Sequence, residues 1–494
     1  MAADPRGKIV LLAGILLGLM GVEDLNLAVN PGFESGLTPW QTQGDVQVSQ
    51  DSVIQGEKSA RIAKGSITQI LPMSGLRIIY IASKVRGTAL KGELKIECLD
   101  RSGRAVMTNL AHFDPKKSEQ EPGVYFKTQA NTHQIKITLR NRGPAVLVDD
   151  FIVRDDTAPE SHRPGVDLTE AMLPYWSSPV IHNETVLVES INGAAPAGTL
   201  LAPPKKVLSV QDYGRKTTYS EGEDYRVTAT GIEAIPGGKL PTVRDKDFPT
   251  ADLQWTDLQG KHVSVTYEKN LDGPYLLRPE PSPNLSVTRN LLKAQKPVRV
   301  VAFGDSITLG IGTSRYSQRT PFQPTWATLV LTKLQEMYKN SRINLYNAAL
   351  GGMTSDWAKA VAPEAVASLK PDLVIYAFGM NDFWWMPAEQ FKANAQAVIE
   401  SVRKQSPKAE FLLIAPMRFD PEYAREGQYP VRLQSYAAVL HSLEEPGVAV
   451  LDMTAITGEL YARKKPKDFL SDPLHPNDFL SRVHAQWIVG MLSP

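Results

Sequence analysis

After Lys296 the chain alternates between short, almost uninterrupted apolar runs and longer segments with a helical period. Runs of this kind are typical of parallel strands that are covered on both faces. Between them apolar residues recur every three or four positions, as Trp326, Leu329 and Val330 do. The apolar runs are VRVVAFG, INLYNA, DLVIYAFG, EFLLIAP and VAVLDM, at residues 298–304, 343–348, 372–379, 410–416 and 448–453. This alternation predicts a doubly wound α/β domain with a parallel sheet at residues 297–494.

The first 285 residues follow another pattern, in which apolar and polar residues alternate over short segments bounded by Gly, Asn and Pro. Alternation with a period of two is typical of strands with one buried face. The segments LKGELKIECLD, HQIKITLRN and AVLVDDFIVR lie within residues 25–156, and ETVLVES, KVLSVQD, DYRVTAT and HVSVTYE lie within residues 166–285. The polar stretch DDTAPESHRPG between the two groups predicts a linker. We therefore expect a multidomain chain, with two N-terminal all-β sandwich domains, 25–156 and 166–285, before the α/β domain.

Residues 1–24 have the composition of a secretory signal peptide. Arg6 and Lys8 precede the apolar run 9–20, which is twelve residues long and too short to span a bilayer. This segment predicts a secreted or periplasmic protein and no integral membrane segment. Asp4 and the lack of a clean small-x-small cleavage site leave an alternative open, in which the apolar run is the first strand of the next domain.

Composition excludes several classes of function. A chain of 494 residues is too long for one hydrophobic core, and about three domains are expected at roughly 150 residues each. The 54 Lys and Arg residues balance 53 Asp and Glu residues, so no net field would attract nucleic acid or anionic lipid. Cys98 is the only cysteine, which excludes an intramolecular disulfide and a thiolate zinc cluster.

Polar motifs follow the predicted strands. Ser306 comes directly after the first strand in VAFGDSITLG, and the next two strands run into YNAALGGMTSD and FGMNDFWW. Near the end of the domain, LSDPLHPND places Asp472 three residues before His475. Ligands in doubly wound folds bind beyond the carboxyl ends of the strands, so we expect these motifs to lie together.

These residue types suit acyl transfer. A serine hydroxyl is a weak nucleophile and needs a base to take its proton, and histidine titrates near neutral pH, which makes His475 the candidate base. A carboxylate such as Asp472 on the other ring nitrogen would fix the tautomer and stabilise the imidazolium. The tetrahedral oxyanion needs donors, and the candidates are the Ser306 N–H, a glycine N–H of the GG pair and the Asn381 side-chain amide.

Together FGDSITLG, NAALGGMTS, GMND and DPLHP resemble the four sequence blocks of the SGNH, or GDSL, hydrolase superfamily, over residues 298–492. The resemblance implies a flavodoxin-like α/β domain that hydrolyses esters without a metal or organic cofactor. The positions that match the family's nucleophile, block-two glycine, asparagine, acid and base are Ser306, Gly352, Asn381, Asp472 and His475. Gly351 is the alternative to Gly352. The superfamily includes lipases, thioesterases and polysaccharide acetylesterases.

The first β domain resembles jelly-roll carbohydrate-binding modules. The resemblance rests on NLAVNPGFESGLTPW at residues 26–40 and LVDDFIVR at residues 147–154, which are similar to the first and last strands of those modules. It implies a structural calcium held by Glu34 and Asp150. The alternative is a β-sandwich that binds no sugar. The second β domain carries no chemical motif, so the sequence assigns it no role.

The sequence therefore predicts a serine esterase that removes acyl groups from a polysaccharide, and the expected acyl group is acetyl. After Asn381 the segment DFWWMP, residues 382–387, would wall off a short acyl pocket or stack on a sugar ring, or else pack the sheet edge. Arg315, Tyr316 and Arg319 follow Ser306 in a polar segment that suits hydroxyls or uronic carboxylates better than lipid. The alternatives are a lipase or thioesterase of the same fold, and a carbohydrate-binding protein with a vestigial hydrolase domain.

Overall fold

The computed structural model describes residues 26–73, 78–88, 91–113, 118–128, 132–155, 168–244, 258–270, 276–317, 319–421 and 431–494. Contacts divide the chain into two compact units, Met1–Arg163 and Pro164–Pro494. The predicted signal peptide and almost all of the predicted linker lie outside the described residues. No helix in the described ranges is long and apolar enough to cross a membrane.

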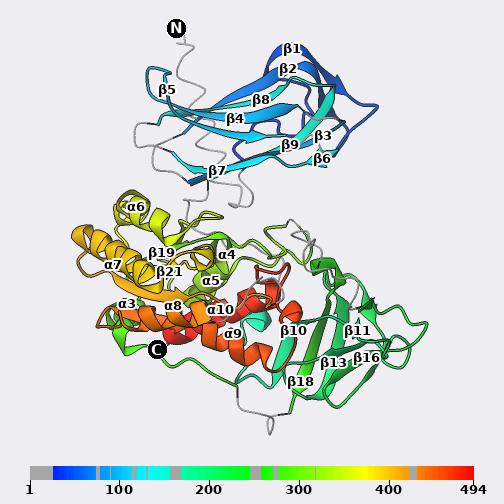
Figure 1. Cartoon of the computed structure of the whole chain (residues 1–494), viewed down its shortest axis with the longest axis vertical. Helices are drawn as coiled ribbons and strands as arrows, with labels where there is room; N and C mark the ends of the chain where they lie inside the picture. The colour runs from blue at the N-terminus through cyan, green and yellow to red at the C-terminus, as the bar shows by residue number, and fades with distance from the viewer. Residues whose placement is uncertain are drawn as a thin grey trace, which may run out of the picture. The chain divides into compact units, whose positions relative to one another are not determined.

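The first unit is built from antiparallel strands (Figure 1). The strands are β1 Gln41–Ser49, β2 Ser59–Pro72, β3 Ile78–Gly87, β4 Gly92–Leu99, β5 Ala105–His112, β6 Glu119–Gln120, β7 Gly123–Lys127, β8 Gln134–Asn141 and β9 Val146–Asp155. Their order is β5-β4-β8-β2-β9-β3-β6, with β1 on β2 and β7 on β3. Along one edge β2 pairs first with β9, at Ala60, and then with β8, from Gly65 onward, so the sheet curls around its core. Trp40 belongs to this core, where its ring lies 4.4 Å from that of Phe151.

The second unit begins with what we call the middle β region, the described residues between 168 and 270. It contains the helix α2 Leu168–Ala171, the 3-10 turn η2 Gln259–Lys261 and the strands β10 Val180–Val186, β11 Glu189–Ser190, β12 Ala197–Thr199, β13 Pro204–Asp212, β14 Thr218–Tyr219, β15 Tyr225–Val227, β16 Gly231–Ala234, β17 Val243–Arg244 and β18 Val263–Lys269. They form a four-stranded sheet, β10-β18-β13-β14, and a five-stranded sheet, β15-β16-β12-β11-β17. Buried side chains of this region, such as Val186 and Tyr267, share one hydrophobic core with Phe469 and Leu480 of the α/β part.

The rest of the second unit is the predicted α/β domain, and each predicted apolar run forms one strand. The strands are β19 Val298–Gly304, β20 Ile343–Asn347, β21 Leu373–Ala377, β22 Glu410–Ala415 and β23 Val448–Asp452. The helices are α3 Ser286–Lys293, α4 Ser306–Leu309, α5 Trp326–Tyr338, α6 Ser355–Ala365, α7 Ala388–Gln405, α8 Val431–His441, α9 Met453–Tyr461 and α10 Asp478–Met491.

All strand pairs of this sheet are parallel, in the order β20-β19-β21-β22-β23. The first strand thus lies between the second and the third, which is the flavodoxin-like order. Helix α5 packs against α10, while α7 packs against α6 and α8, and Figure 1 shows these helices gathered around the sheet. The parallel sheet predicted from the sequence is confirmed.

Candidate active site

Ser306 is the first residue of α4, directly after the carboxyl end of β19. Asp305 caps this helix, because its carboxylate accepts a hydrogen bond of 3.0 Å from the Ile307 N–H. The strand β19 is the one at which the strand order reverses, and ligands of doubly wound folds bind at this point. The fold therefore places the predicted nucleophile where the sequence placed it, and Ser306 is 6% exposed.

His475 and Asp472 lie on one loop between the 3-10 turn η6, Pro466–Asp468, and α10. The His475 Nε2 lies 2.8 Å from the Ser306 Oγ, and its Nδ1 lies 3.0 Å from each carboxylate oxygen of Asp472. The Asp472 Oδ1 also accepts the backbone N–H groups of Leu474 and His475, at 2.8 and 3.0 Å, which fixes the carboxylate on its own loop. The structure thus brings the three predicted residues into one hydrogen-bonded chain, carboxylate to imidazole to hydroxyl.

Gly312, which the sequence analysis did not single out, lets this loop approach Ser306. Its φ is +94°, and a Cβ added there would lie 2.5 Å from the Pro476 carbonyl oxygen and 2.8 Å from the His475 Cβ. Any side chain at this position would push against the loop that carries the imidazole. The only sequence signal is a glycine six residues after the serine, which by itself also fits an ordinary turn.

The other two motifs lie at the ends of β20 and β21. The Asn381 Nδ2 donates a 2.9 Å hydrogen bond to the Met353 carbonyl, so the loop after β21 is tied to the loop after β20. Gly352 has a φ of +77°, with nothing within 4 Å of an added Cβ, so backbone conformation and not crowding favours glycine there. An added Cβ on Gly351 would lie 3.9 Å from the Ser306 Cβ, so the GG turn lies next to the serine.

Two buried carboxyl groups support these loops, and both were missed at the sequence level. Burial, together with the nearby Asp382 charge, raises the pKa of Asp305 to about 7. Burial also raises the pKa of Asp382, whose Oδ1 accepts hydrogen bonds from the Ser355 N–H and Oγ at 2.8 and 2.5 Å. Asp305 directly precedes Ser306 in FGDSITLG, and Asp382 directly follows Asn381 in GMND. This adjacency to the candidate site residues is the sequence signal that could have found them.

The aromatic segment after Asn381 divides into a buried and an exposed half. Phe383 and Met386 are buried, at 4% and 0% exposure, and the Phe383 ring packs edge-on against Phe419 at 4.9 Å. Trp384 and Trp385 are 47% and 57% exposed. The sequence alone left both roles open for all four, and the structure separates them into packing residues and surface residues.

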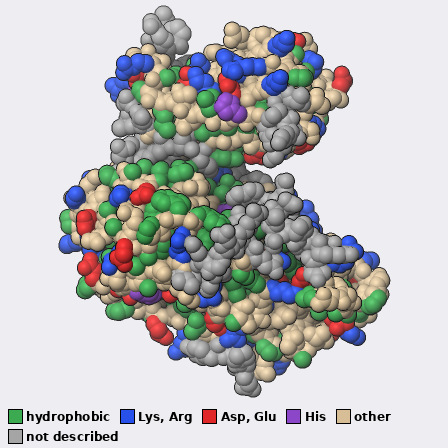
Figure 2. Space-filling model, in the orientation of Figure 1, with side chains coloured by type: hydrophobic (Ala, Val, Ile, Leu, Met, Phe, Trp, Pro, Cys, Tyr) green, Lys and Arg blue, Asp and Glu red, His purple; other side chains and the backbone are tan. Residues whose placement is uncertain are grey.

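The structure places the polar side chains after Ser306 near the surface. Arg315 and Tyr316 are partly buried and Arg319 is exposed. Over the visible face of the second unit, basic and acidic side chains are interspersed without a large patch of one sign (Figure 2).

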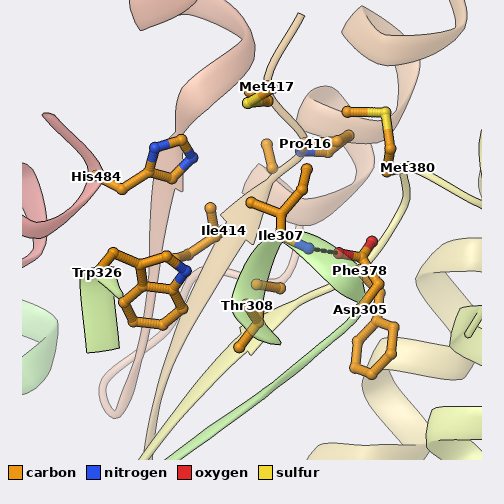
Figure 3. Close-up of a pocket in the computed structure, with 12 residues that line it drawn as sticks. Asp305, Ile307, Thr308, Trp326, Phe378, Met380, Ile414, Pro416, Met417 and His484 are labelled. Atoms are coloured by element: carbon orange, nitrogen blue, oxygen red, sulfur yellow. Dashed lines mark hydrogen bonds between the residues drawn. The ribbon is translucent and has the colours of Figure 1, made fainter. Parts of the chain in front are cut away.

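A cavity of about 20 Å³ lies beside Asp305, with Ile307, Trp326 and His484 among its lining residues (Figure 3). This volume holds about one water molecule. Ser306 and His475 do not line it, so it is not the space for an acyl group. His484 Nδ1 lies 2.9 Å from the Leu480 carbonyl, and burial lowers its pKa to about 4, as for a neutral core histidine.

The described residues contain no group of three or more His, Cys, Asp and Glu side chains that could hold a metal. For the predicted calcium, the Glu34 carboxylate accepts the Glu57 N–H at 3.0 Å, and the Asp150 carboxylate forms a 2.8 Å ion pair with Lys84. Both carboxylates thus have partners within the first unit, which a calcium ion would have to share or displace. Calcium in the first unit stays a prediction.

Comparison with known proteins gives one family match. Residues 302–481 match the model of the GDSL-like Lipase/Acylhydrolase family. None of the curated proteins matches the chain.

Three solved structures align with parts of the chain. Axe2, an acetylxylan esterase from Geobacillus stearothermophilus, aligns at 20% identity and a TM-score of 0.34, over 40% of this chain and 94% of that one. TmCBM61, solved in complex with beta-1,4-galactotriose, aligns at 20% identity and a TM-score of 0.23, over 26% of this chain and 98% of that one. The enzymatically active domain of tailspike protein 4 from bacteriophage CBA120 aligns at 13% identity and a TM-score of 0.24, over 26% of this chain and 21% of that one.

The family match covers the segments that carry all four motifs, from β19 into α10. This part of the chain is therefore a carboxylic ester hydrolase domain that is similar to the GDSL-like Lipase/Acylhydrolase family.

Proposed function

We propose that the chain is a serine esterase that removes acetyl groups from a polysaccharide, with Ser306 as nucleophile, His475 as base and Asp472 as the group that orients the base. The observation that carries the proposal is the 2.8 Å contact between His475 Nε2 and Ser306 Oγ, with Asp472 on the opposite ring nitrogen. A free serine does not lose its hydroxyl proton near neutral pH, and in this geometry His475 is placed to accept that proton.

In the acylation step Ser306 Oγ attacks the ester carbonyl carbon while its proton passes to His475 Nε2. The resulting tetrahedral oxyanion would accept hydrogen bonds from the N–H groups of Ser306 and Gly352 and from the Asn381 amide. The Asn381 side-chain nitrogen carries two hydrogens, and one of them donates to the Met353 carbonyl. This bond fixes the plane of the amide and therefore the direction of the second hydrogen, which would donate to the oxyanion. Collapse breaks the bond to the sugar oxygen, which leaves with the proton from His475.

In the deacylation step a water molecule attacks the acetyl-serine ester. His475 takes a proton from this water, and the second tetrahedral intermediate collapses to acetate and free Ser306, which regains its proton. The Asp472 carboxylate stabilises the imidazolium in both steps and takes no proton itself. None of these steps requires a metal or an organic cofactor.

Two exposed tryptophans that follow Asn381 in the sequence support a carbohydrate substrate. Trp384 and Trp385 follow Asn381 by three and four residues and remain about half exposed. Tryptophan presents a large apolar face with a polar N–H at its edge, which suits the apolar faces and hydroxyls of sugar rings. Two large apolar rings exposed to water lower the solubility of a protein, so their exposure favours a role in ligand binding. We propose that they hold the sugar that carries the acetyl group.

We further propose that the first unit is a β-sandwich separate from a second, middle one, and that it binds the polymer. It is a compact unit of its own. Binding of this unit to the polymer would tether the esterase and raise the effective concentration of ester at the active site. Trp40 is not a platform for this binding, because it is 5% exposed and its Nε1 donates to the Asn30 carbonyl. Together with the predicted signal peptide, such a role fits a secreted or periplasmic enzyme.

The test combines kinetics with product analysis. Ser306→Ala and His475→Ala should each remove nearly all turnover of a nitrophenyl acetate, and the double variant should be little worse than either, because the two residues act as a unit. Asn381→Ala should lower kcat less, by on the order of 100-fold to 1000-fold. Mass spectrometry of acetate released from a panel of acetylated polysaccharides identifies the polymer. Retention of more than a tenth of the activity by Ser306→Ala would exclude the mechanism.

A further inference from the structure

One strand of the middle β region holds both ends of the loop that carries Asp472 and His475. The Thr185 Oγ1 donates a 2.6 Å hydrogen bond to the Asp468 carbonyl and accepts one of 2.9 Å from the Asn477 Nδ2. Asn477 stands two residues after His475, and its Oδ1 caps α10 by accepting the N–H groups of Phe479 and Leu480. The Asn477 Nδ2 also donates a 2.8 Å hydrogen bond directly to the Asp468 carbonyl. The Thr185 hydroxyl thus attaches an already joined pair of loop ends, and the following helix, to β10.

A buried ion pair reinforces the same attachment. Lys464 and Glu184 have fully buried side chains, and the Lys464 Nζ lies 2.5 Å from the Glu184 Oε1. Glu184 also accepts hydrogen bonds from the Leu201 N–H and the Tyr267 Oη, both at 2.8 Å. A buried pair contributes little net stability, because both charges lose their water, but separation of its partners would leave each charge buried and unpaired, so the two segments stay together.

The middle β region also holds the segment that follows Ser306. The Gln259 Nε2 donates to the Gly312 carbonyl, and the Gln259 Oε1 accepts a 2.9 Å hydrogen bond from the Ser317 Oγ. Gly312 is the residue against which the His475 Cβ packs. Two neighbouring parts of one region, β10 and η2, therefore hold the serine segment and the histidine loop at the same time.

We infer that the middle β region is a positioning frame for the active site, with Thr185 and Gln259 as positioning residues that set the distance between His475 Nε2 and Ser306 Oγ. The inference rests on the proposed function, and it assigns a role to a region that carries no chemical motif. The serine and the histidine belong to segments 169 residues apart in the sequence. Because the middle β region binds both segments, it fixes the distance between them more tightly than either loop does alone. A displacement of about 1 Å is enough to lower the rate on the order of 100-fold.

Thr185→Val tests this frame, because valine keeps the shape of threonine and removes the hydroxyl. We expect kcat on a small acetyl ester to fall about 10-fold or more, with KM within twofold and a parallel fall in the rate at which a fluorophosphonate labels Ser306. Thr185→Ser keeps the hydroxyl and should restore kcat to within threefold of the unaltered chain. The matched control is Thr266→Val, which removes a 2.9 Å hydrogen bond to the Asn183 N–H inside the middle β region.

The outcomes separate positioning from stability. The inference is supported if Thr185→Val and Thr266→Val lose similar unfolding free energy but only Thr185→Val loses kcat. It is overturned if Thr185→Val keeps kcat within twofold, or if both variants lose kcat in proportion to their lost stability. Full activity of Ser306→Ala would refute the proposed function instead, so the two failures are distinguishable.

Gln259→Leu provides a second test should Thr185→Val fail to fold. This change removes the contacts to Gly312 and Ser317 together. Its control is Gln211→Leu, which removes a 3.2 Å hydrogen bond to Thr218 in the same region. We expect Gln259→Leu alone to lower kcat at unchanged KM, and equal kcat in the two leucine variants would overturn the inference.

Discussion

Gly312→Ala is the sharpest test of how the serine segment and the histidine loop meet. An alanine Cβ would lie 2.5 Å from the Pro476 carbonyl oxygen and from the Ser471 Oγ, and 2.8 Å from the His475 Cβ. Non-bonded carbon contacts are favourable at about 3.5–4.0 Å, so these atoms must retreat by on the order of 1 Å. All three belong to the loop that carries His475, and the retreat moves the imidazole away from Ser306.

The expected loss follows from that displacement. The hydrogen bond of 2.8 Å between His475 Nε2 and Ser306 Oγ would stretch beyond about 3.5 Å, where it no longer counts as one. A misplacement of this size costs on the order of 100-fold in kcat, with little change in KM, because the substrate surface itself is not altered. The positive φ of Gly312 adds a stability cost of roughly 1–2 kcal/mol for any residue with a Cβ.

Gly237→Ala is the matched control for that stability cost. Gly237 lies in the middle β region with a φ of +84°, and nothing lies within 4 Å of an added Cβ. The variant should lose comparable unfolding free energy in urea and keep its kcat for nitrophenyl acetate. A kcat for Gly312→Ala within threefold of the unaltered chain, in a protein that remains folded, would refute the reasoning that the loop contact sets the catalytic distance.

Three further predictions concern substrate, metal and pH. The enzyme should prefer acetyl over butyryl and longer nitrophenyl esters, and deletion of residues 1–163 should remove activity on polymer but not on the small ester; faster turnover of the octanoyl ester would indicate a lipase. EDTA should leave kcat unchanged and lower the melting temperature of the first unit only if calcium binds there, whereas a kcat loss that a divalent ion restores would contradict metal-free chemistry. Between about pH 4 and 7 the folded chain keeps a proton on Asp305 that the unfolded chain has released, so the unfolding free energy from this group falls as the pH rises through that window. His262 and His484, whose pKa values burial lowers to about 4, act in the opposite direction below about pH 6.5. The unfolded histidines are still partly protonated at pH 6.5 and offset this fall, so the measured quantity is the difference between the unaltered chain and Asp305→Asn in urea titrations. From pH 6.5 to 7.5 the unaltered chain should lose about 0.7 kcal/mol more unfolding free energy than Asp305→Asn, and equal changes in the two proteins would contradict the assignment.

The strands of the α/β domain were predictable because each one is an apolar run that ends in turn residues. The run 298–304 is β19 without a residue of difference, and the other four agree within two residues at either end. Ser306 and Asn381 were predicted as site residues because polar residues follow two neighbouring strands, and His475 because it stands three residues after Asp472 near the end of the same domain. Local pattern was sufficient where the structure itself is local.

Contacts between distant segments left no such pattern. Thr185 and Asp468 are 283 residues apart, and a threonine in an alternating strand looks the same whether it faces solvent or a catalytic loop. Lys464 likewise stands in the sequence RKKPKD, which is typical of an exposed helix end, yet its side chain is fully buried on Glu184. Neither residue type nor spacing indicated that the middle β region and the hydrolase domain share one core.

The shared core changes how the accessory β regions are understood. A module that only tethers an enzyme to a polymer needs a flexible connection and a polar boundary, so that it can move over its substrate. The middle β region has the opposite properties, since Glu184 and Lys464 are buried together and Thr185 and Gln259 bond to the active-site segments. Removal of this region would expose those charges and release the histidine loop, so it belongs to the catalytic unit. The proposed tethering role therefore falls to the first unit, which is a separate compact unit.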